Sequence, residues 1–402
     1  MRLSGRPSLH AAFALCVEVL GLVLIVAAAV ESGGRWPLHQ GPLDFAIYYH
    51  SAGALAAGGS PFTQGALDPP TFSLILQPLT PFGLPTAYAI FTVASAAVMA
   101  IGLWLGATRL GLRGPAVVVA VAGLLWYPVL HGLVLGQPVP IVVGLLLVVL
   151  FLVSTERLAW GGLLASLLWI KPDMTTPVII VMALAIGVFL SRSWRFIVPF
   201  VGGSAAFFAV QASRFVPWLH LLATSTQTTV SRPSQISITA AVGLLQNSAA
   251  AGQLQWMLTA TKVLVLACAV VGLLGLFVWL LPRTAGWLRL PGWERLWWSA
   301  GITATVWMIA SPYTQLYDEA FVLPLILVAV RHDAAQVRTL AQSAIVLLAA
   351  LPLLTVLAAP ATFLIPVANL ALLAWTWQEL ATVDAQPAEA RRASGKVRAL
   401  TS

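Results

Sequence analysis

Residues 84–107, LPTAYAIFTVASAAVMAIGLWLGA, form an apolar run that contains no charged side chain. A helix of this length crosses the roughly 30 Å hydrocarbon core of a bilayer. Similar runs recur from one end of the chain to the other, and 59% of the residues are hydrophobic while 8% are charged. The sequence therefore predicts an all-α, polytopic integral membrane protein.

Hydropathy predicts about twelve transmembrane helices. They are residues 11–30, 84–107, 114–130, 138–153, 158–170, 177–190, 197–213, 257–281, 297–311, 319–330, 339–358 and 361–378. The runs 158–170 and 319–330 are shorter than a bilayer requires, and both lie beside polar stretches that contain proline. Irregular backbone at membrane depth is tolerated where protein buries it or where it lines a wet cavity. We therefore expect these broken ends to line a site.

Basic residues predict the orientation of these helices, because Lys and Arg concentrate in cytoplasmic loops. Sixteen of the 21 Lys and Arg residues fall on one side if the N-terminus is cytoplasmic. They are Arg2, Arg6, Arg109, Arg113, Arg157, Arg192, Arg195, Arg283, Arg289, Arg295, Arg331, Arg338, Arg391, Arg392, Lys396 and Arg398. The same rule explains the net charge of +8 without a nucleic-acid partner. We expect a multi-pass plasma-membrane protein with both termini in the cytoplasm.

No stretch has the length of an independent soluble core. We expect residues 1–380 to form a single transmembrane domain and residues 381–402 to form a disordered cytoplasmic tail. The longest loops, near 31–83 and 214–256, fall on the extracytoplasmic side. The chemistry is therefore expected at that membrane face.

The first of these loops carries Asp44, within residues 41–62, GPLDFAIYYHSAGALAAGGSPF. Carboxylates near a bilayer are expensive unless a site needs them. The residues after Asp44 recur at helical spacing and predict an amphipathic helix on the interface, through Phe45, Tyr48, Tyr49, Ala52 and Leu55. Asp44 precedes this helix, so capping its N-terminus is as good an explanation as catalysis.

Asp68 lies in the stretch LDPPTF, where the two prolines that follow it favour the role of a turn residue. The alternative role is that of a site residue, as a partner of Asp44. Two carboxylates in one loop suit a general base and an orienting or metal-binding group. Tyr48 has an equal alternative role as an interfacial aromatic anchor. The sequence contains no HExxH, no CxxC and no clustered ligand spacing that would predict a structural zinc. A divalent ion bound by Asp44 or Asp68, which would assist the departure of the phosphate, is an open alternative.

Three further motifs follow in order. Residues 59–62 read Gly-Ser-Pro-Phe, residues 131–140 read HGLVLGQPVP with Gln137 at the start of a helix, and residues 167–177 read LLWIKPDMTTP with Lys171 closing a short span. This order, over roughly residues 40–330, resembles glycosyltransferase family 87 of the GT-C superfamily. The family comprises integral membrane mannosyltransferases that use polyprenyl-phosphate sugars, and related arabinofuranosyltransferases.

The resemblance implies a GT-C fold with extracytoplasmic re-entrant or interfacial helices. It also implies a polyprenyl-phosphate sugar donor, a glycolipid or polysaccharide acceptor, membrane lipid as a partner, and an inverting displacement in which Asp44 is the general base. Mannose is the expected sugar and arabinofuranose the alternative. The lack of GxGxxG, of a P-loop and of a nucleotide-binding βαβ pattern favours a lipid-linked donor over a nucleotide sugar.

The donor phosphate requires cationic or polar groups, because negative charge grows on its oxygens as it leaves. The candidates on the outer face are Lys171, Arg214 and Arg232. Lys171 could instead snorkel to the interface, and Arg214 could anchor a helix end. The stretch SPYTQLYDEAF offers Tyr317 and Asp318 for sugar contacts.

Gln137 and His131 complete the candidate substrate-binding residues, although the simpler explanation of His131 is an interfacial polar residue. The opposing class is a membrane transporter or lipid flippase, which would also use broken helices and sparse intramembrane charges such as Glu18 and Lys262. A transporter should place polar residues near the membrane midplane, whereas these candidates fall on one face. The sequence therefore favours the enzyme.

Overall fold

The computed structural model describes residues 43–64, 67–112, 116–229, 255–280, 287–288, 290–311, 314–331 and 364–382. All regular elements in these ranges are helices, which confirms the predicted all-α class. The predicted spans 11–30 and 339–358, and nearly all of the predicted tail, lie outside the described residues.

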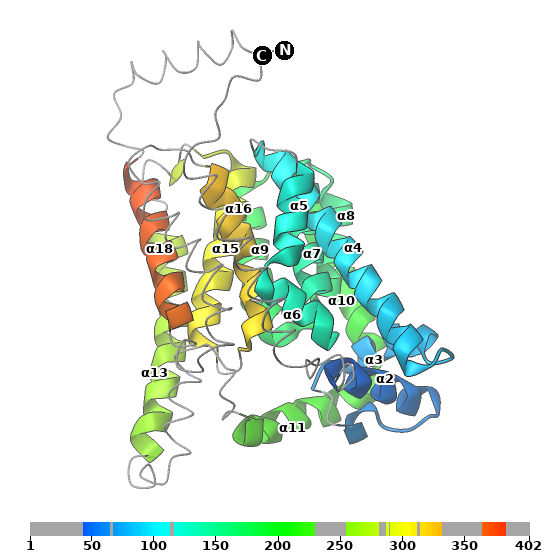
Figure 1. Ribbon diagram of the computed structural model, residues 1–402. Coiled ribbons are helices and arrows are strands. Elements are labelled where there is room, and N and C mark those ends of the chain that lie inside the picture. Colours follow the sequence, from blue (N-terminus) through cyan, green and yellow to red (C-terminus); the bar gives the residue numbers. More distant parts are fainter. Residues whose placement is uncertain are drawn as a thin grey trace, which may run out of the picture.

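The helices form a bundle that is covered at one end by short or transverse helices (Figure 1). The covering elements are α2 (Leu43–Ala56), η2 (Pro61–Gln64), α3 (Pro70–Leu76), η3 (Gln77–Leu79) and α11 (Ala212–Thr229). The bundle contains α4 (Leu84–Leu110), α5 (Ala116–Leu125), α6 (Tyr127–Leu135), α7 (Val139–Ser154), α8 (Leu158–Ala165), η4 (Ser166–Ile170), α9 (Pro172–Phe189), α10 (Trp194–Ala209), α13 (Gln255–Leu274), η6 (Gly275–Leu280), α15 (Gly292–Ala310), η8 (Leu316–Val322), α16 (Leu323–Arg331) and α18 (Leu364–Thr382).

Two described helices, α4 and α9, are long and apolar enough to cross a membrane. The number rises to four if each of two bent pairs counts as one span. Other predicted spans correspond to shorter apolar helices, including α7 and the joined α8 and η4. The fold therefore has two to four candidate membrane spans among the described residues.

The two bent pairs fall where the sequence predicts single spans. The predicted span 114–130 contains a 60° bend between α5 and α6, where Trp126, the N-cap of α6, is extended and Pro128 lies in the first turn of α6. The predicted span 197–213 contains an 82° bend between α10 and α11. This second bend sends α11 across the end of the bundle (Figure 1).

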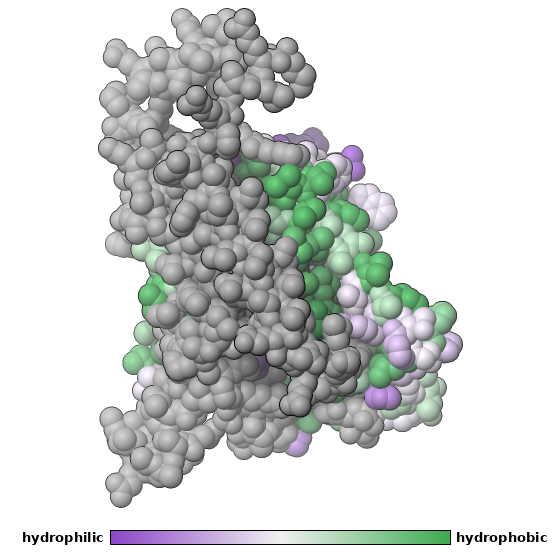
Figure 2. All heavy atoms as spheres, in the orientation of Figure 1, coloured by the Kyte–Doolittle hydropathy of each residue, from purple (hydrophilic) through white to green (hydrophobic). Residues whose placement is uncertain are grey.

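Small residues allow the long helices to approach closely. A Cβ atom on Gly102 of α4 would lie 2.5 Å from the carbonyl oxygen of Gly144 in α7. The buried Met99 and Leu103 flank this crossing on α4. Around it, exposed apolar side chains of α4 and α5 form a hydrophobic surface (Figure 2), which includes Val93, Ile101, Trp104, Val117, Val118 and Val121.

The predicted interfacial helix exists as α2, but its apolar side chains pack on protein. Phe45, Tyr48, Ala52 and Leu55 are all buried. Phe45 lies 5.1 Å from Phe91 of α4, and Tyr48 lies 5.3 Å from Phe72 of α3, both measured between ring centroids. The expectation that this face lies in the membrane interface was wrong, because α3 and α4 already cover it.

The C-terminal ends of α4 and α16 lie at the opposite end of the bundle from α2 and α11 (Figure 1). Arg109, at the end of α4, lies 4.0 Å over the ring of Trp293, and Arg331, at the end of α16, forms a 2.8 Å ion pair with Glu294. Arg157, Arg192, Arg195 and Arg295 occupy helix ends on the same side. This end of the bundle therefore carries six of the arginines that the sequence analysis assigns to the cytoplasmic side.

Candidate active site

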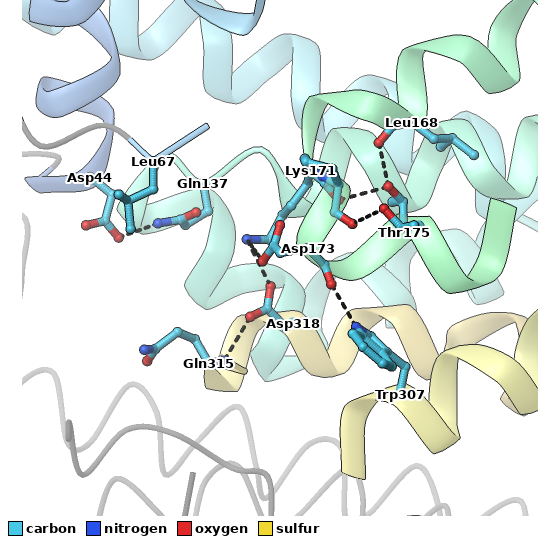
Figure 3. A network of polar contacts seen from close by, with 12 residues as sticks. Asp44, Leu67, Gln137, Leu168, Lys171, Asp173, Thr175, Trp307, Gln315 and Asp318 are labelled. Carbon is cyan, nitrogen blue, oxygen red and sulfur yellow. Dashed lines mark hydrogen bonds and ion pairs between the residues drawn. The ribbon is translucent and has the colours of Figure 1, made fainter. Parts of the chain in front are cut away.

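The candidate residues lie at the bundle end that faces α2 and α11, on links between helices. Asp44 begins α2, Gln137 separates α6 from α7, Lys171 separates η4 from α9, and Asp318 lies in η8. Figure 3 shows their side chains directed toward one region from these four elements. Residues that are far apart in the sequence thus meet at the end of the bundle remote from the arginines.

Asp44 and Gln137 form the first contact of the site. The Gln137 side-chain Nε2 donates to Asp44 Oδ2 across 2.6 Å (Figure 3). Asp44 is half-buried in the first turn of α2, where the helix dipole favours a negative charge, and Gln137 is 4% exposed. This hydrogen bond aligns the carboxylate while leaving part of it accessible.

The position of Gln137 follows from the way α6 ends. Gly136 adopts a left-handed φ of +69°, and the Gln137 N–H donates to the Gly132 carbonyl across 2.8 Å. This is a Schellman ending, which requires glycine at its left-handed position. A Cβ atom on Gly136 would lie 2.5 Å from the Phe45 Cβ, so the turn also packs directly on α2. The glycine thereby brings Gln137 beside Asp44.

Tyr48 and Asp68 extend this contact into a chain. Tyr48 lies one helical turn after Asp44, and its hydroxyl donates to Gln137 Oε1 across 3.1 Å. The same hydroxyl hydrogen-bonds the carboxyl group of Asp68, in the loop between η2 and α3. The structure therefore brings the two candidate carboxylates of the first loop together.

Burial raises the pKa of Asp68 to about 7, from an ordinary value of 3.8. The Lys171 charge and the Tyr48 hydrogen bond oppose this rise, whereas the charges of Asp173 and Asp44 add to it. Asp68 lies outside the membrane-spanning helices and titrates near neutral pH. It therefore differs from an ordinary turn aspartate.

Lys171 is the buried cation of the site, at 4% exposure. It ends η4 and precedes Pro172, and the Thr175 hydroxyl binds the carbonyls of Leu168 and Lys171 to fix this irregular backbone. Its Nζ lies 3.2 Å from Asp173 Oδ2 and 3.6 Å from Asp318 Oδ1. Burial between two carboxylates excludes the snorkelling role for Lys171, because that role needs an exposed ammonium.

Asp318 is fully buried and anchored by its own helix start. Its Oδ2 accepts the Gln315 backbone N–H across 2.8 Å, as part of a capping box. The neighbouring Tyr317 ring lies 5.9 Å from Lys171 Nζ and 6.2 Å from the His131 ring. Tyr317, Asp318 and His131 therefore border the Lys171 side of the site.

Arg214 contacts a backbone carbonyl of the first loop rather than a carboxylate of the site. Its guanidinium donates to the Gly59 carbonyl across 2.7 Å, and the nearby Trp218 donates to the Leu67 carbonyl across 2.8 Å. These bonds hold α11 against the first loop, on either side of η2. The remaining candidate cation, Arg232, lies outside the described residues.

The sequence reasoning missed Asp173, whose Oδ2 lies 3.2 Å from Lys171 Nζ. Asp173 stands in the quoted stretch LLWIKPDMTTP, and a carboxylate two residues after a lysine in an apolar region was the available signal. Its backbone carbonyl accepts the Trp307 indole N–H across 2.7 Å (Figure 3). The site thus combines one buried ammonium with the carboxyl groups of Asp44, Asp68, Asp173 and Asp318.

Within the described ranges, no group of three or more His, Cys, Asp or Glu residues is arranged to hold a metal ion.

Comparison with known proteins identifies a family for this chain. The model of glycosyltransferase family 87 matches residues 67–290, more than half of the chain. No curated protein and no solved structure matches. The matched range includes Asp68, Gln137, Lys171 and Asp173, whereas Asp44 and Asp318 flank it.

Proposed function

The chain belongs to glycosyltransferase family 87 and is a membrane glycosyltransferase; from this premise we propose its substrates and mechanism. It transfers mannose from a polyprenyl-phosphate donor to a glycolipid or polysaccharide acceptor, on the extracytoplasmic face, with inversion at the sugar carbon C1. The observation that carries this proposal is the alignment of the Asp44 carboxylate by Gln137, beside the buried Lys171.

Asp44 is the general base of this mechanism. An acceptor hydroxyl is a weak nucleophile until a positioned carboxylate takes its proton. The hydroxyl oxygen bonds to C1 of the sugar while the bond from C1 to the phosphate oxygen breaks and its electron pair leaves with the polyprenyl phosphate. The hydroxyl proton moves to Asp44, whose orientation the 2.6 Å hydrogen bond from Gln137 maintains.

Lys171 binds the phosphate of the donor. Its exposed partner Asp173, with a side-chain exposure of 37%, can give way to an incoming phosphate oxygen, whereas Asp318 is fully buried and stays. Exposed ion pairs contribute little, so this exchange costs little. The bound ammonium then stabilises the charge that develops on the leaving phosphate.

Tyr317 and His131 place the sugar beside Lys171, and the buried Asp318 holds the Lys171 ammonium from the opposite side. An aromatic ring packs on the apolar face of a sugar, and carboxylate or imidazole groups bind its hydroxyls. Arg214 secures the first loop through Gly59, and Arg232 is proposed as a second phosphate contact.

Arg109 and Arg331, in the last turns of α4 and α16, lie at the end of the bundle opposite the site and support the proposed orientation. In this orientation the arginine end faces the cytoplasm, both termini lie on that side, and about twelve helices span the plasma membrane. The active site then opens to the outside, where polyprenyl-linked donors and envelope acceptors would meet.

A direct transfer assay tests the proposal. Membranes with equal amounts of the wild type and of Asp44→Asn are supplied with radiolabelled polyprenyl-phosphate mannose or polyprenyl-phosphate arabinofuranose, and an extracted acceptor pool. We expect labelled mannosyl product from the wild type alone. Product from arabinofuranose only would correct the sugar. Full activity of Asp44→Asn would show that Asp44 is a helix cap, and no transfer of either sugar would refute the donor.

A further inference from the structure

The first turn of α9, which follows Lys171, cannot form all the hydrogen bonds of a regular helix. In an α-helix each backbone carbonyl accepts the N–H of the residue four positions later. For the Asp173 carbonyl that residue is Pro177, which lies inside α9 and has no N–H. The sequence of α9 therefore leaves the Asp173 carbonyl without its regular donor.

The indole of Trp307 supplies a donor from a neighbouring helix. Trp307 lies in α15, which packs against α9, and its Nε1 donates to the Asp173 carbonyl across 2.7 Å (Figure 3). A proline ring also crowds the carbonyl four residues before it, so a donor from outside the helix suits this position. The contact ties the start of α9 to α15.

Side-chain hydroxyls bind other carbonyls at the start of α9. The Thr175 hydroxyl binds the Lys171 carbonyl across 2.9 Å, and the Thr176 hydroxyl donates to the Pro172 carbonyl across 2.6 Å. Both threonines belong to α9 itself, whereas Trp307 belongs to another helix. The Trp307 bond therefore places this turn relative to the rest of the bundle.

The backbone at residues 171–173 determines where the Lys171 ammonium lies. Lys171 has a non-helical backbone, with φ −130° and ψ 73°, between η4 and α9. Its Nζ lies 3.2 Å from Asp173 Oδ2, so the residue that Trp307 binds is also the exposed partner of the ammonium. If this turn were loose, the donor phosphate would have to order it on binding.

We propose that Trp307 is a positioning residue for the donor phosphate, which holds the 171–173 turn in place by supplying the N–H that Pro177 lacks. The inference rests on the proposed function, because it takes Lys171 to bind the phosphate. Trp307 acts through the backbone of Asp173 and does not take part in the chemical step. It lies outside the matched range 67–290, so the inference adds α15 to the donor site.

This role predicts an effect on donor binding rather than on the rate of transfer. Ordering a loose turn lowers the affinity for the donor. The bound ground state and the transition state need the same ordered turn, so the barrier between them stays the same. Loss of the Trp307 bond should therefore raise the KM for the donor and leave kcat nearly unchanged.

Steady-state kinetics of Trp307→Phe with polyprenyl-phosphate mannose test this prediction. Phenylalanine keeps an aromatic ring but has no N–H. We expect the donor KM to rise about three- to tenfold, as for the loss of one hydrogen bond, with kcat within about twofold of the wild type. Trp104→Phe, on the exposed surface of α4, is the matched control and should leave both constants within about twofold. Membrane abundance and the thermal unfolding midpoint serve as folding controls.

A second substitution separates positioning from packing. Pro177→Ala restores a backbone N–H at position 177, which can donate to the Asp173 carbonyl without Trp307. The double variant that combines Trp307→Phe with Pro177→Ala should therefore have a donor KM within about twofold of Pro177→Ala alone. A packing role would give no such rescue, because alanine at position 177 fills none of the space that the indole leaves.

Two results would overturn the inference. The donor KM of Trp307→Phe could equal that of the wild type, which would make the Trp307 bond irrelevant to donor binding. Alternatively, the raised KM could persist in the double variant, which would assign the effect to lost packing. Both results are distinct from failure of the proposed function, which appears as full activity of Asp44→Asn or as no transfer by the wild type.

Discussion

Gln137 donates its side-chain N–H to the Asp44 carboxylate across 2.6 Å, although 93 residues separate the two in the chain. The contact joins the turn between α6 and α7 to the first turn of α2. Because both side chains start from helix ends that pack on each other through Gly136 and Phe45, the bond is held by backbone packing. The alignment of the proposed base therefore depends on the fold of a distant turn.

Replacing Gln137 with leucine should reduce catalysis more than donor binding. Leucine has a similar volume but cannot hold the Asp44 carboxylate, and a misplacement of about 1 Å can reduce a rate roughly 100-fold. We expect kcat to fall about 10- to 100-fold with a small change in the KM for the donor. The same substitution at Gln211, between α10 and α11, serves as the control and should leave kcat within about twofold. An equal fall in both variants would argue against a specific role for Gln137.

Replacing Gly136 with alanine should destabilise the protein and lower activity together. The left-handed φ of +69° is strained for alanine, and the new Cβ would lie 2.5 Å from the Phe45 Cβ. We expect a loss of about 1–3 kcal/mol, measured as a lower thermal unfolding midpoint in detergent. Gly187→Ala is the matched control, since a Cβ there meets nothing within 4 Å and alanine favours the helix. If the two variants unfold alike, the turn is more adaptable than its geometry indicates.

Replacing Asp173 with asparagine should improve donor binding. Asp173 is the exposed partner of Lys171, so its carboxylate competes with the donor phosphate for the ammonium. Removing an exposed ion pair is worth a few tenths of a kcal/mol to about 1 kcal/mol, which corresponds to a KM lower by about two- to fivefold. The steady-state KM for the polyprenyl-phosphate sugar measures the effect. A higher KM would instead make Asp173 part of the donor site, for example as a ligand of the sugar.

Much of the site could be predicted from the sequence because charges are rare in this chain. With 8% charged residues, Asp44, Lys171 and Asp318 are conspicuous between apolar runs. The Gly136-Gln137 pair was also noticed, as part of a motif. What the sequence could not give was the bond between Gln137 and Asp44, because hydropathy describes single spans and contains no information on which loops meet.

The errors have the same origin. The apolar side of α2 looked like a membrane-facing surface, since periodicity shows that a face is buried but does not show what buries it. The bends after α5 and α10 interrupt runs that hydropathy treats as continuous. Asp173 was not predicted as a site residue, although it lies in the first turn of α9, two residues after Lys171.

Replacing Glu319 with glutamine should leave the protein as stable as the wild type. Glu319 is fully buried in η8, and its Oε2 accepts a hydrogen bond from Asn369 Nδ2 of α18 across 3.2 Å. Within the described part of the chain, Glu319 Oε1 and Asn369 Oδ1 have no hydrogen-bond partner. A proton on Oε1 would satisfy both atoms at once, by closing a second hydrogen bond between the carboxylic acid and the amide.

A glutamine at position 319 can make the same pair of hydrogen bonds, with its NH₂ group in place of the acid proton. We therefore expect the thermal unfolding midpoint of Glu319→Gln to stay within about 1 °C of the wild type. Asn369→Leu should lower stability by about 1–3 kcal/mol, because it leaves a buried carboxyl group without its partner. If Glu319→Gln is as destabilising as Asn369→Leu, then Glu319 is ionised in the folded protein and a cation outside the described residues must balance it.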